Sequence, residues 1–430
     1  MPHHGSVARL LADLTPLRSS PPFRRMWLGT SLSGVGAQLT NVAVALQVFE
    51  LTGSNLAVGL VGLFALVPLV GLGLYGGALV DAHDRRTVVL VTQLGILLTS
   101  ATLVAVSWRG VASPAALYAV VAVQSGLFAV NYPARSAIVP RLVDAPLLPA
   151  ANALSSLSTG VAMTLGPMLA GVLVSRLGYA PSYAVETVLL LVALACLAGL
   201  PPIPPEGVAA RPGLRSVLDG LRFLATRPNV RTTFLVDLAA MVLAMPRVLF
   251  PAVGAVVLGG GSTTAGMLVS AVALGAVLGG LLSGPLGRVR RQGRAVVGAV
   301  GVWGLAVAAF GLVVLAAPGA RPGDPAHWLL WPALALMVLA GSADTVSAVF
   351  RTTILQTATP DEMRGRLQGV FIVVVAGGPQ LGTLLLGAVA THLGEGGAAL
   401  AGGLACLAAV LLLATWQRAF LRYDALDPSP

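Results

Sequence analysis

The feature that constrains the fold most is a series of twelve apolar segments separated by short polar connections. A helix needs about 20 apolar residues to cross the hydrocarbon core of a bilayer. Each segment is close to that length, and the chain of 430 residues has little length left for a further domain. The sequence therefore predicts an all-α integral membrane protein with twelve transmembrane helices. The predicted spans are 26–49, 55–80, 87–108, 112–134, 150–175, 181–200, 232–258, 263–287, 295–317, 327–350, 367–392 and 396–416.

The distribution of positive charge predicts the orientation of these helices. All 26 basic residues are Arg, since the chain has no Lys. Three of them, Arg109, Arg176 and Arg321, fall in one set of connections, and Arg247 falls inside a span. All the others lie at the chain ends or in the alternate connections, so the positive-inside rule places both termini in the cytoplasm. The absence of Lys with abundant Ala, Gly and Arg indicates a bacterial chain, and hence the bacterial inner membrane.

Several function classes lack the residues that they need. A Walker A nucleotide site and a pyridoxal Schiff base both require Lys, and neither H-E-x-x-H nor G-x-S-x-G occurs. Cys196 and Cys406 each lie in an apolar run, which gives no support to a disulfide framework or a metal site. The Arg clusters fit membrane loops better than nucleic-acid binding. We expect no enzyme, no cofactor, no metal and no obligate protein partner; the expected partners are a small-molecule substrate and the lipid bilayer.

A polar stretch divides the chain near its middle. It gives an N-terminal six-helix bundle over 1–200, a cytoplasmic linker over 201–230 with an amphipathic helix around 214–225, and a C-terminal six-helix bundle with a tail over 231–430. The halves repeat weakly, at an offset of 207 residues in the first part of each half and 216 residues in the later part. Two pseudo-symmetric bundles in the same orientation follow, as in one class of secondary transporters. The matching positions are Arg135 with Arg351, Gly166 with Gly382, and Gly171 with Gly387.

The connection between the second and third spans contains an acid followed by two Arg. It resembles the signature G-x-x-x-D-[RK]-x-G-[RK]-[RK] of the major facilitator superfamily, although Ala82 replaces a basic residue and Asp84 replaces a glycine. The resemblance implies a gate between the two halves; the alternative is that these charges only fix the topology. The matching residues are Gly77, Asp81, Arg85 and Arg86.

A second resemblance lies between the tenth and eleventh spans. The stretch 355–366 is similar to the T-P-x-x-x-x-G-R loop of drug and siderophore exporters of this superfamily, and it adds Asp361, Arg364 and Arg366 to the gate. The likeness runs over nearly the whole chain and is greatest to the branch of enterobactin exporters and drug:proton antiporters. It implies proton-coupled export of a siderophore or related metabolite by alternating access. A multidrug or macrolide efflux pump is the alternative, and a membrane receptor or scaffold is the alternative without transport.

Ionisable residues inside spans are costly and are functional candidates by default. Asp237, Asp344 and Glu186 are therefore candidates for the coupling proton, with Glu186 nearer the outer face, where a carboxylate can reach water. Such a carboxylate binds and releases protons, and the proton gradient supplies the energy. The alternative is that Asp237 and Asp344 pair with Arg or with helix ends for structural reasons.

The substrate cavity has its own candidates among the polar residues of the spans. Arg247 is the only Arg deep within a predicted span, and its guanidinium suits an anionic or catechol-like ligand. An ion pair between helices is the alternative for Arg247, and helix packing is the alternative for the neutral residues. These neutral candidates are Gln38, Asn41, Gln124 and Asn131.

Overall fold

The computed structural model describes residues 13–204, 222–281, 289–317, 327–357 and 361–424, and nearly all of this part of the chain is helical. The first group of helices is α1 (Thr15–Ser19), α2 (Pro21–Thr52), α3 (Asn55–Ala82), α4 (Arg85–Trp108), α5 (Pro114–Leu142), α6 (Leu148–Leu177) and α7 (Tyr179–Ala198). The second group is α9 (Pro228–Leu243), α10 (Phe250–Ala252), α11 (Gly261–Leu281), α12 (Gln292–Ala316), α13 (His327–Thr357), α14 (Asp361–Trp416) and α15 (Arg418–Leu421).

The number of membrane crossings agrees with the sequence prediction. Eleven helical segments in the described ranges are long and apolar enough to cross a bilayer, and one of them belongs to α14. Helix α14 consists of two arms, because Gly394 adopts φ 67° and ψ 176°, a backbone conformation that is cheap only for glycine. The two arms complete the twelve predicted spans.

Three predicted boundaries were wrong. Helix α5 extends to Leu142 rather than ending at 134, α13 extends to Thr357 rather than ending at 350, and α14 begins at Asp361 rather than 367. The segment that resembles the exporter loop is thus helical from Asp361 onward. The hydropathy pattern ended α5 and α13 too early because it reads Arg135 and Arg351 as loop residues, and it began α14 too late because the first residues of that helix are charged. Most of the predicted amphipathic helix, over 205–221, lies outside the described residues.

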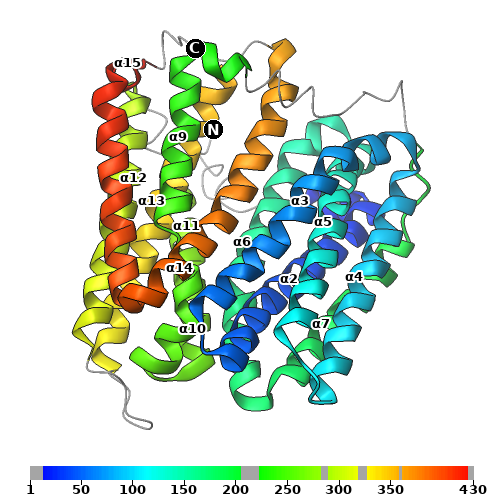
Figure 1. The fold of residues 1–430 in the computed structure, drawn as a ribbon. Helices are drawn as coiled ribbons and strands as arrows, with labels where there is room; N and C mark the ends of the chain where they lie inside the picture. Colours follow the sequence, from blue (N-terminus) through cyan, green and yellow to red (C-terminus); the bar gives the residue numbers. More distant parts are fainter. Residues whose placement is uncertain (1–12, 205–221, 282–288, 318–326, 358–360, 425–430) are drawn as a thin grey trace, which may run out of the picture.

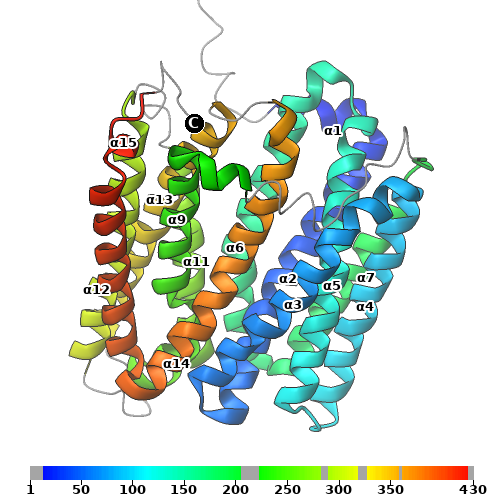
Figure 2. The ribbon, with the colours of Figure 1, turned by 45° about the horizontal axis from the view of Figure 1, so that its top comes forward.

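The helices form two bundles, which lie side by side in Figure 1 and Figure 2: an N-terminal bundle of α2–α7 and a C-terminal bundle of α9–α14. Both described chain ends lie at the same side of the molecule, which we call the terminal side. The other side, where α3 and α11 begin and α14 bends, is the opposite side. The bundles meet along two seams, one between α6 and α11 and the other between α3 and α14.

Four glycines show the symmetry of these seams. Within the bundles, Gly166 of α6 packs on α2, and Gly382 of α14 packs on α9. Across the seams, a Cβ on Gly171 would lie 2.5 Å from the carbonyl oxygen of Ser262, and one on Gly387 would lie 2.6 Å from that of Asn55. Equivalent helices therefore use equivalent glycines for close backbone contact, as expected for packing without a hydrophobic driving force.

We expect Gly171→Ala to lower the stability of the protein, because its methyl group would overlap the backbone of α11. Overpacking of this kind costs about 1–3 kcal/mol. Gly71→Ala is the matched control, since nothing lies within 4 Å of a Cβ at that position of α3. The midpoint of thermal unfolding in detergent should fall for the first variant alone. Equal midpoints for the two variants would contradict the assigned packing.

Candidate functional site

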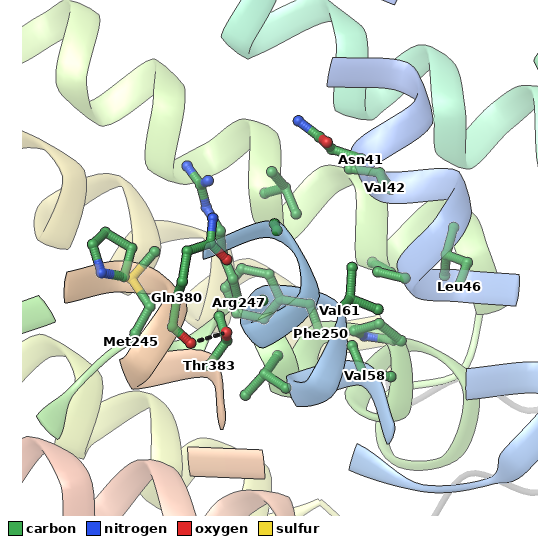
Figure 3. Close-up of a pocket in the computed structure, with 18 of the residues that line it drawn as sticks. Asn41, Val42, Leu46, Val58, Val61, Met245, Arg247, Phe250, Gln380 and Thr383 are labelled. Carbon is green, nitrogen blue, oxygen red and sulfur yellow. Dashed lines mark hydrogen bonds between the residues drawn. The ribbon is translucent and has the colours of Figure 1, made fainter. Parts of the chain in front are cut away.

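A cavity of about 200 Å³ lies between the two bundles (Figure 3). Its walls come from α2, α3, α11, α14 and the segment 245–251, with one residue from α5. Most of the lining is aliphatic or aromatic, as is usual for small-molecule sites, and a few polar groups remain to orient a ligand. The polar lining residues are Gln38, Asn41, Arg247, Gln380 and Thr383.

A break in the seventh membrane span places Arg247 at this cavity. Helix α9 ends at Leu243, and a 3₁₀ turn over Pro246–Leu249 follows before the chain becomes helical again. Pro246 has no backbone N–H and cannot continue the hydrogen-bond ladder of α9. The indole of Trp303 donates a hydrogen bond of 3.1 Å to the carbonyl oxygen of Ala244, which satisfies one carbonyl released by the break. Trp303 of α12 thus stabilises the break between α9 and the 3₁₀ turn.

Arg247 has the chemistry of a ligand-binding residue. It is the only charged residue among those that line the cavity. Its buried Nε has no hydrogen-bond partner among the described residues, and its charge interacts with that of Asp344 on α13. An unpaired N–H group beside the cavity can donate a hydrogen bond to an anionic or polar group of a ligand.

Gln380 and Thr383 are cavity residues that sequence reasoning missed. They lie one turn apart on α14, directly after Pro379, and the Thr383 hydroxyl donates a 2.8 Å hydrogen bond to the carbonyl oxygen of Gln380 (Figure 3). Polar residues spaced by three next to a helix proline were the available signal. Among the sequence candidates, Gln38, Asn41 and Arg247 line the same cavity.

The other two polar candidates are not among the residues that line the cavity. Gln124 lies on α5, and its buried Nε2 has no hydrogen-bond partner in the described ranges. Asn131 is buried, and its amide donates to the Thr92 hydroxyl at 2.7 Å and to the Val89 carbonyl at 3.4 Å. The Asn131 side chain therefore connects α5 to α4 inside the N-terminal bundle.

A buried ion network links α9 to α13 in the C-terminal bundle. Arg351 forms a salt bridge with Asp237 and lies 3.5 Å from a carboxylate oxygen of Asp344. The side chains of Arg351 and Asp237 are 9% and 5% exposed, whereas that of Asp344 is 39% exposed. Two of the three predicted acids, Asp237 and Asp344, thus share the cation of Arg351, and Asp344 also interacts electrostatically with Arg247.

Arg351 corrects the expectation that Arg247 is the only Arg deep within a span. Because α13 continues to Thr357, Arg351 is a buried helix residue rather than a loop residue. Its counterpart in the N-terminal bundle, Arg135, lies within α5 and donates to Gln93 Oε1 at 2.5 Å. The repeat therefore pairs one Arg with carboxylates and the other with a neutral amide.

Glu186 differs from its expected surroundings. The sequence places it near the outer face with access to water, but the residue is only 1% exposed inside the N-terminal bundle. Its carboxyl group contacts the hydroxyls of Thr40 on α2 and Ser100 on α4. Helices α2, α4 and α7 pack around Glu186 and exclude water from it. The hydropathy of the sequence does not reveal this packing.

The gate residues are only partly described. The surroundings of Gly77 and the side chains of Asp81, Asp361, Arg364 and Arg366 lie outside the described residues. The backbone places the first two residues near the end of α3 and the others at the start of α14.

The described gate residues make contacts inside the N-terminal half. Arg85 donates to the Ala137 carbonyl at 3.1 Å, and Arg86 donates to the Ala198 carbonyl at 2.7 Å.

Asp84, which departs from the superfamily signature, has a defined role. Its carboxylate caps α4 through the amide of Thr87 at 2.8 Å and accepts a hydrogen bond of 2.6 Å from the amide of Ile203. Partial burial raises the pKa of Asp84, but these hydrogen bonds from backbone amides outweigh it, and the pKa lies below its ordinary value. Asp84 thereby fixes the start of the linker to the signature loop.

We expect Arg351→Gln to destabilise the protein by about 3–5 kcal/mol, because it leaves the buried carboxylate of Asp237 without a cation. Adding Asp237→Asn to this variant should restore much of the loss, since no buried charge then remains unpaired at that position. The free energy of unfolding in detergent measures both effects.

Arg290→Gln is the control for this experiment. It removes an exposed ion pair with Asp424, whose N–O distance is 2.6 Å, and should cost less than about 1 kcal/mol. Equal losses from Arg351→Gln and Arg290→Gln would show that the buried network contributes no more than a surface pair.

Two bundles of membrane-spanning helices around a cavity at their interface define a multi-pass inner-membrane transporter of the major facilitator type. The chain belongs to the transmembrane secretion effector family of this superfamily, whose model matches residues 11–429. The family and the relatives below are membrane transporters rather than enzymes.

Curated relatives and solved structures agree with this assignment. The chain is 30% identical to the enterobactin exporter EntS of Citrobacter koseri, over 98% of this chain and 97% of the relative. It is 31% identical to EntS of Shigella boydii, over 94% and 93% of the two chains. The fold resembles a POT family transporter solved with 5-aminolevulinic acid, with TM-score 0.71, 10% identity and coverage of 93% and 97%. It also resembles the nucleoside transporter NupG, with TM-score 0.68, 15% identity and coverage of 94% and 99%.

Proposed function

We propose that this protein exports a siderophore or a related organic metabolite from the cytoplasm in exchange for protons, by alternating access. The observation that carries the proposal is the cavity between the bundles, with Arg247 on its wall and an Asp–Arg–Asp network beside it. The names of the EntS relatives support export and the class of substrate. The Arg distribution supports a cytoplasmic terminal side.

The contacts between the bundles support a state that is closed at the opposite side. There the Asn55 side chain at the start of α3 donates to Glu395 of α14 at 2.8 Å, and the Ser262 hydroxyl of α11 donates to the Gly171 carbonyl of α6 at 3.0 Å. With a cytoplasmic terminal side, these contacts close the periplasmic end. Rocking of the two bundles about the cavity would break them and open that end to release the substrate.

The ion network offers a route for coupling to protons. In the closed state described above, Arg351 ties α13 to an ionised Asp237 on α9. Protonation of Asp237 would remove the attraction and free α9 to move. In an antiport cycle the substrate would bind and cross with Asp237 ionised, and a proton from the opposite side would then neutralise Asp237 after the substrate has left. The return to the closed state described above would release that proton to the cytoplasm and restore the pair with Arg351.

The size of the cavity limits what it can hold in this conformation. Its volume of about 200 Å³ is below the roughly 300–1,000 Å³ that drug-sized ligands usually occupy. We expect one ring or one anionic group of a larger molecule to bind here while the rest extends toward the terminal side. Arg247 would hold that group, and the aliphatic wall would pack against its ring.

The mostly apolar wall also favours a second candidate, a multidrug or macrolide efflux pump. Val42, Leu46, Val61 and Phe250 present surfaces that recognise shape rather than charge (Figure 3). The two candidates differ in what they require of Arg247, because a neutral or cationic drug gains nothing from its charge.

We expect Arg247→Gln to weaken binding of an anionic or catechol-containing ligand at least tenfold, since it removes a charge-assisted hydrogen bond worth about 1.5–3 kcal/mol. Binding of a cationic drug should change less than twofold. Calorimetry on the purified protein measures both affinities. Arg109→Gln, at an exposed position on the opposite side, is the control variant. Equal losses for the two ligand classes would favour the multidrug candidate.

We expect Asp237→Asn and Asp344→Asn to uncouple transport from the proton gradient, because a carboxamide mimics the protonated acid permanently. In proteoliposomes with an imposed pH gradient, uphill accumulation should be lost while ligand binding and downhill exchange remain. Asp144→Asn, in an exposed connection, is the control. Uphill transport at the wild-type rate by the single variants and by the double variant would refute the assigned coupling.

A further inference from the structure

A polar cluster inside the N-terminal bundle is separate from the central cavity. Its centre is Glu186 on α7, which is buried against α2 and α4 and does not line the cavity. The carboxyl oxygen Oε2 contacts the hydroxyls of Thr40 and Ser100, the latter at 2.7 Å. No cationic side chain is shown paired with it in the described ranges. A buried carboxylate with only neutral donors bears a large desolvation cost if it is ionised.

The number of hydroxyl protons around Glu186 distinguishes its ionised form from its protonated form. Thr187 donates its only hydroxyl proton to the Tyr183 carbonyl at 2.9 Å, because a carbonyl can only accept. The Ser100 hydroxyl lies 2.9 Å from Thr187 Oγ1 and has one proton for two oxygen neighbours. If Glu186 is ionised, Ser100 donates its only hydroxyl proton to Glu186. No proton is then left to form a hydrogen bond between the Ser100 and Thr187 oxygens.

A protonated carboxyl group completes the chain of hydrogen bonds. The Glu186 O–H then donates to Ser100, Ser100 donates to Thr187, and Thr187 donates to the Tyr183 carbonyl. Every hydroxyl of the chain has both a donor and an acceptor, and no net charge is buried. The geometry of the cluster thus fits the neutral acid.

A polar route leads from this cluster to the opposite side. The Tyr183 hydroxyl interacts with Glu186 electrostatically rather than through a hydrogen bond among the described residues, and it donates to Gln47 Oε1 at 2.9 Å. Gln47 Nε2 donates to the Ser107 hydroxyl at 3.2 Å. Gln47 and Ser107 both line an open depression of about 370 Å³ in the surface, together with Trp108 and Tyr179. These polar side chains therefore lead from the opposite side toward the cluster, whereas Glu186 does not line the central cavity.

Few other charged groups face this route. Glu50 of α2 accepts a 2.5 Å hydrogen bond from the Tyr179 hydroxyl at the surface. Arg109, directly after α4, and Arg176, near the end of α6, are exposed at the same side. The remaining charged residues of α2 and α4 lie at the terminal side. They are Arg24, Arg25, Arg85 and Arg86.

We infer that Glu186 is a second proton-binding site, which exchanges protons with the opposite side along the polar path of Tyr183, Gln47 and Ser107, where water entering from the depression carries the proton because the Gln47 amide cannot. Its proton holds α2 against α7, because a Cβ on Gly36 of α2 would lie 3.1 Å from Glu186 Cγ, and an ionised, hydrated carboxylate needs more room. Helix α2 also carries Gln38 and Asn41 on the cavity wall. Loss of the proton therefore loosens a helix that lines the cavity. This site adds to the proposed proton coupling and does not depend on it.

Infrared spectroscopy of the full-length protein in liposomes tests whether the acid is protonated. At pH 7 the wild type should show the C=O stretch of a protonated carboxylic acid, and Glu186→Gln should lack that component. Glu50→Gln, which changes the surface acid at the same side, should retain it. Identical bands in wild type and Glu186→Gln overturn the proposal. Ser100→Ala keeps the acid and should shift the frequency of the band; an unchanged frequency also overturns the proposal.

The rate of deuterium exchange at the same band tests the route. On transfer to D₂O, Ser107→Val should slow the isotope shift of the band at least fivefold, because it removes a polar group at the entrance. Thr102→Val, on the exposed face of the same helix, should exchange at the wild-type rate. Equal rates for the two variants overturn the assigned route. Since neither measurement involves transport, a failure here is distinguishable from a failure of the proposed export.

Discussion

The pairing of Arg351 with two carboxylates from different helices is the interaction on which the C-terminal bundle depends most. A single unpaired charge at this depth costs several kcal/mol, so Arg351 and Asp237 tolerate burial only together. The pair fixes α9 against α13. The break that follows α9 then has a defined position, and Arg247 reaches the cavity because of that break. Charge pairing and cavity geometry are thus parts of one arrangement.

The two bundles have related backbone packing, but the polar partners of their buried side chains differ. At equivalent positions, Arg351 meets carboxylates, whereas Arg135 meets the neutral Gln93. The N-terminal bundle instead buries an acid, Glu186, among hydroxyl groups. A hydroxyl neighbour satisfies a carboxyl group at a lower cost when the acid is neutral. The backbone symmetry therefore does not extend to the ionisable groups, and the two halves can respond differently to protons.

Several features of the candidate site were predictable, and several were not. Gln38, Asn41 and Arg247, which the sequence singles out, lie on the cavity wall, because isolated polar residues in apolar spans favour an interior. Gln380 and Thr383 lie near the middle of the predicted span 367–392 and were missed, because hydropathy does not show which face of a helix a polar residue occupies. Arg351 was assigned to a loop, since hydropathy alone treats an Arg as the end of a span. Its partner, Asp237, lies more than a hundred residues away along the chain, and only the folded structure brings the two side chains together.

The sequence by itself determined the helical class, the number of spans, the two-part organisation and the family, because a bilayer accepts only helices of a certain length whose backbone polar groups are satisfied internally. It also determined the positions of the close-packing glycines, since the internal repeat aligns them. The tertiary structure alone decided which buried acid meets a cation, which meets hydroxyl groups, and which polar residues share the cavity. These outcomes depend on contacts between helices distant in the chain, and hydropathy carries no information about the neighbour that a side chain will meet.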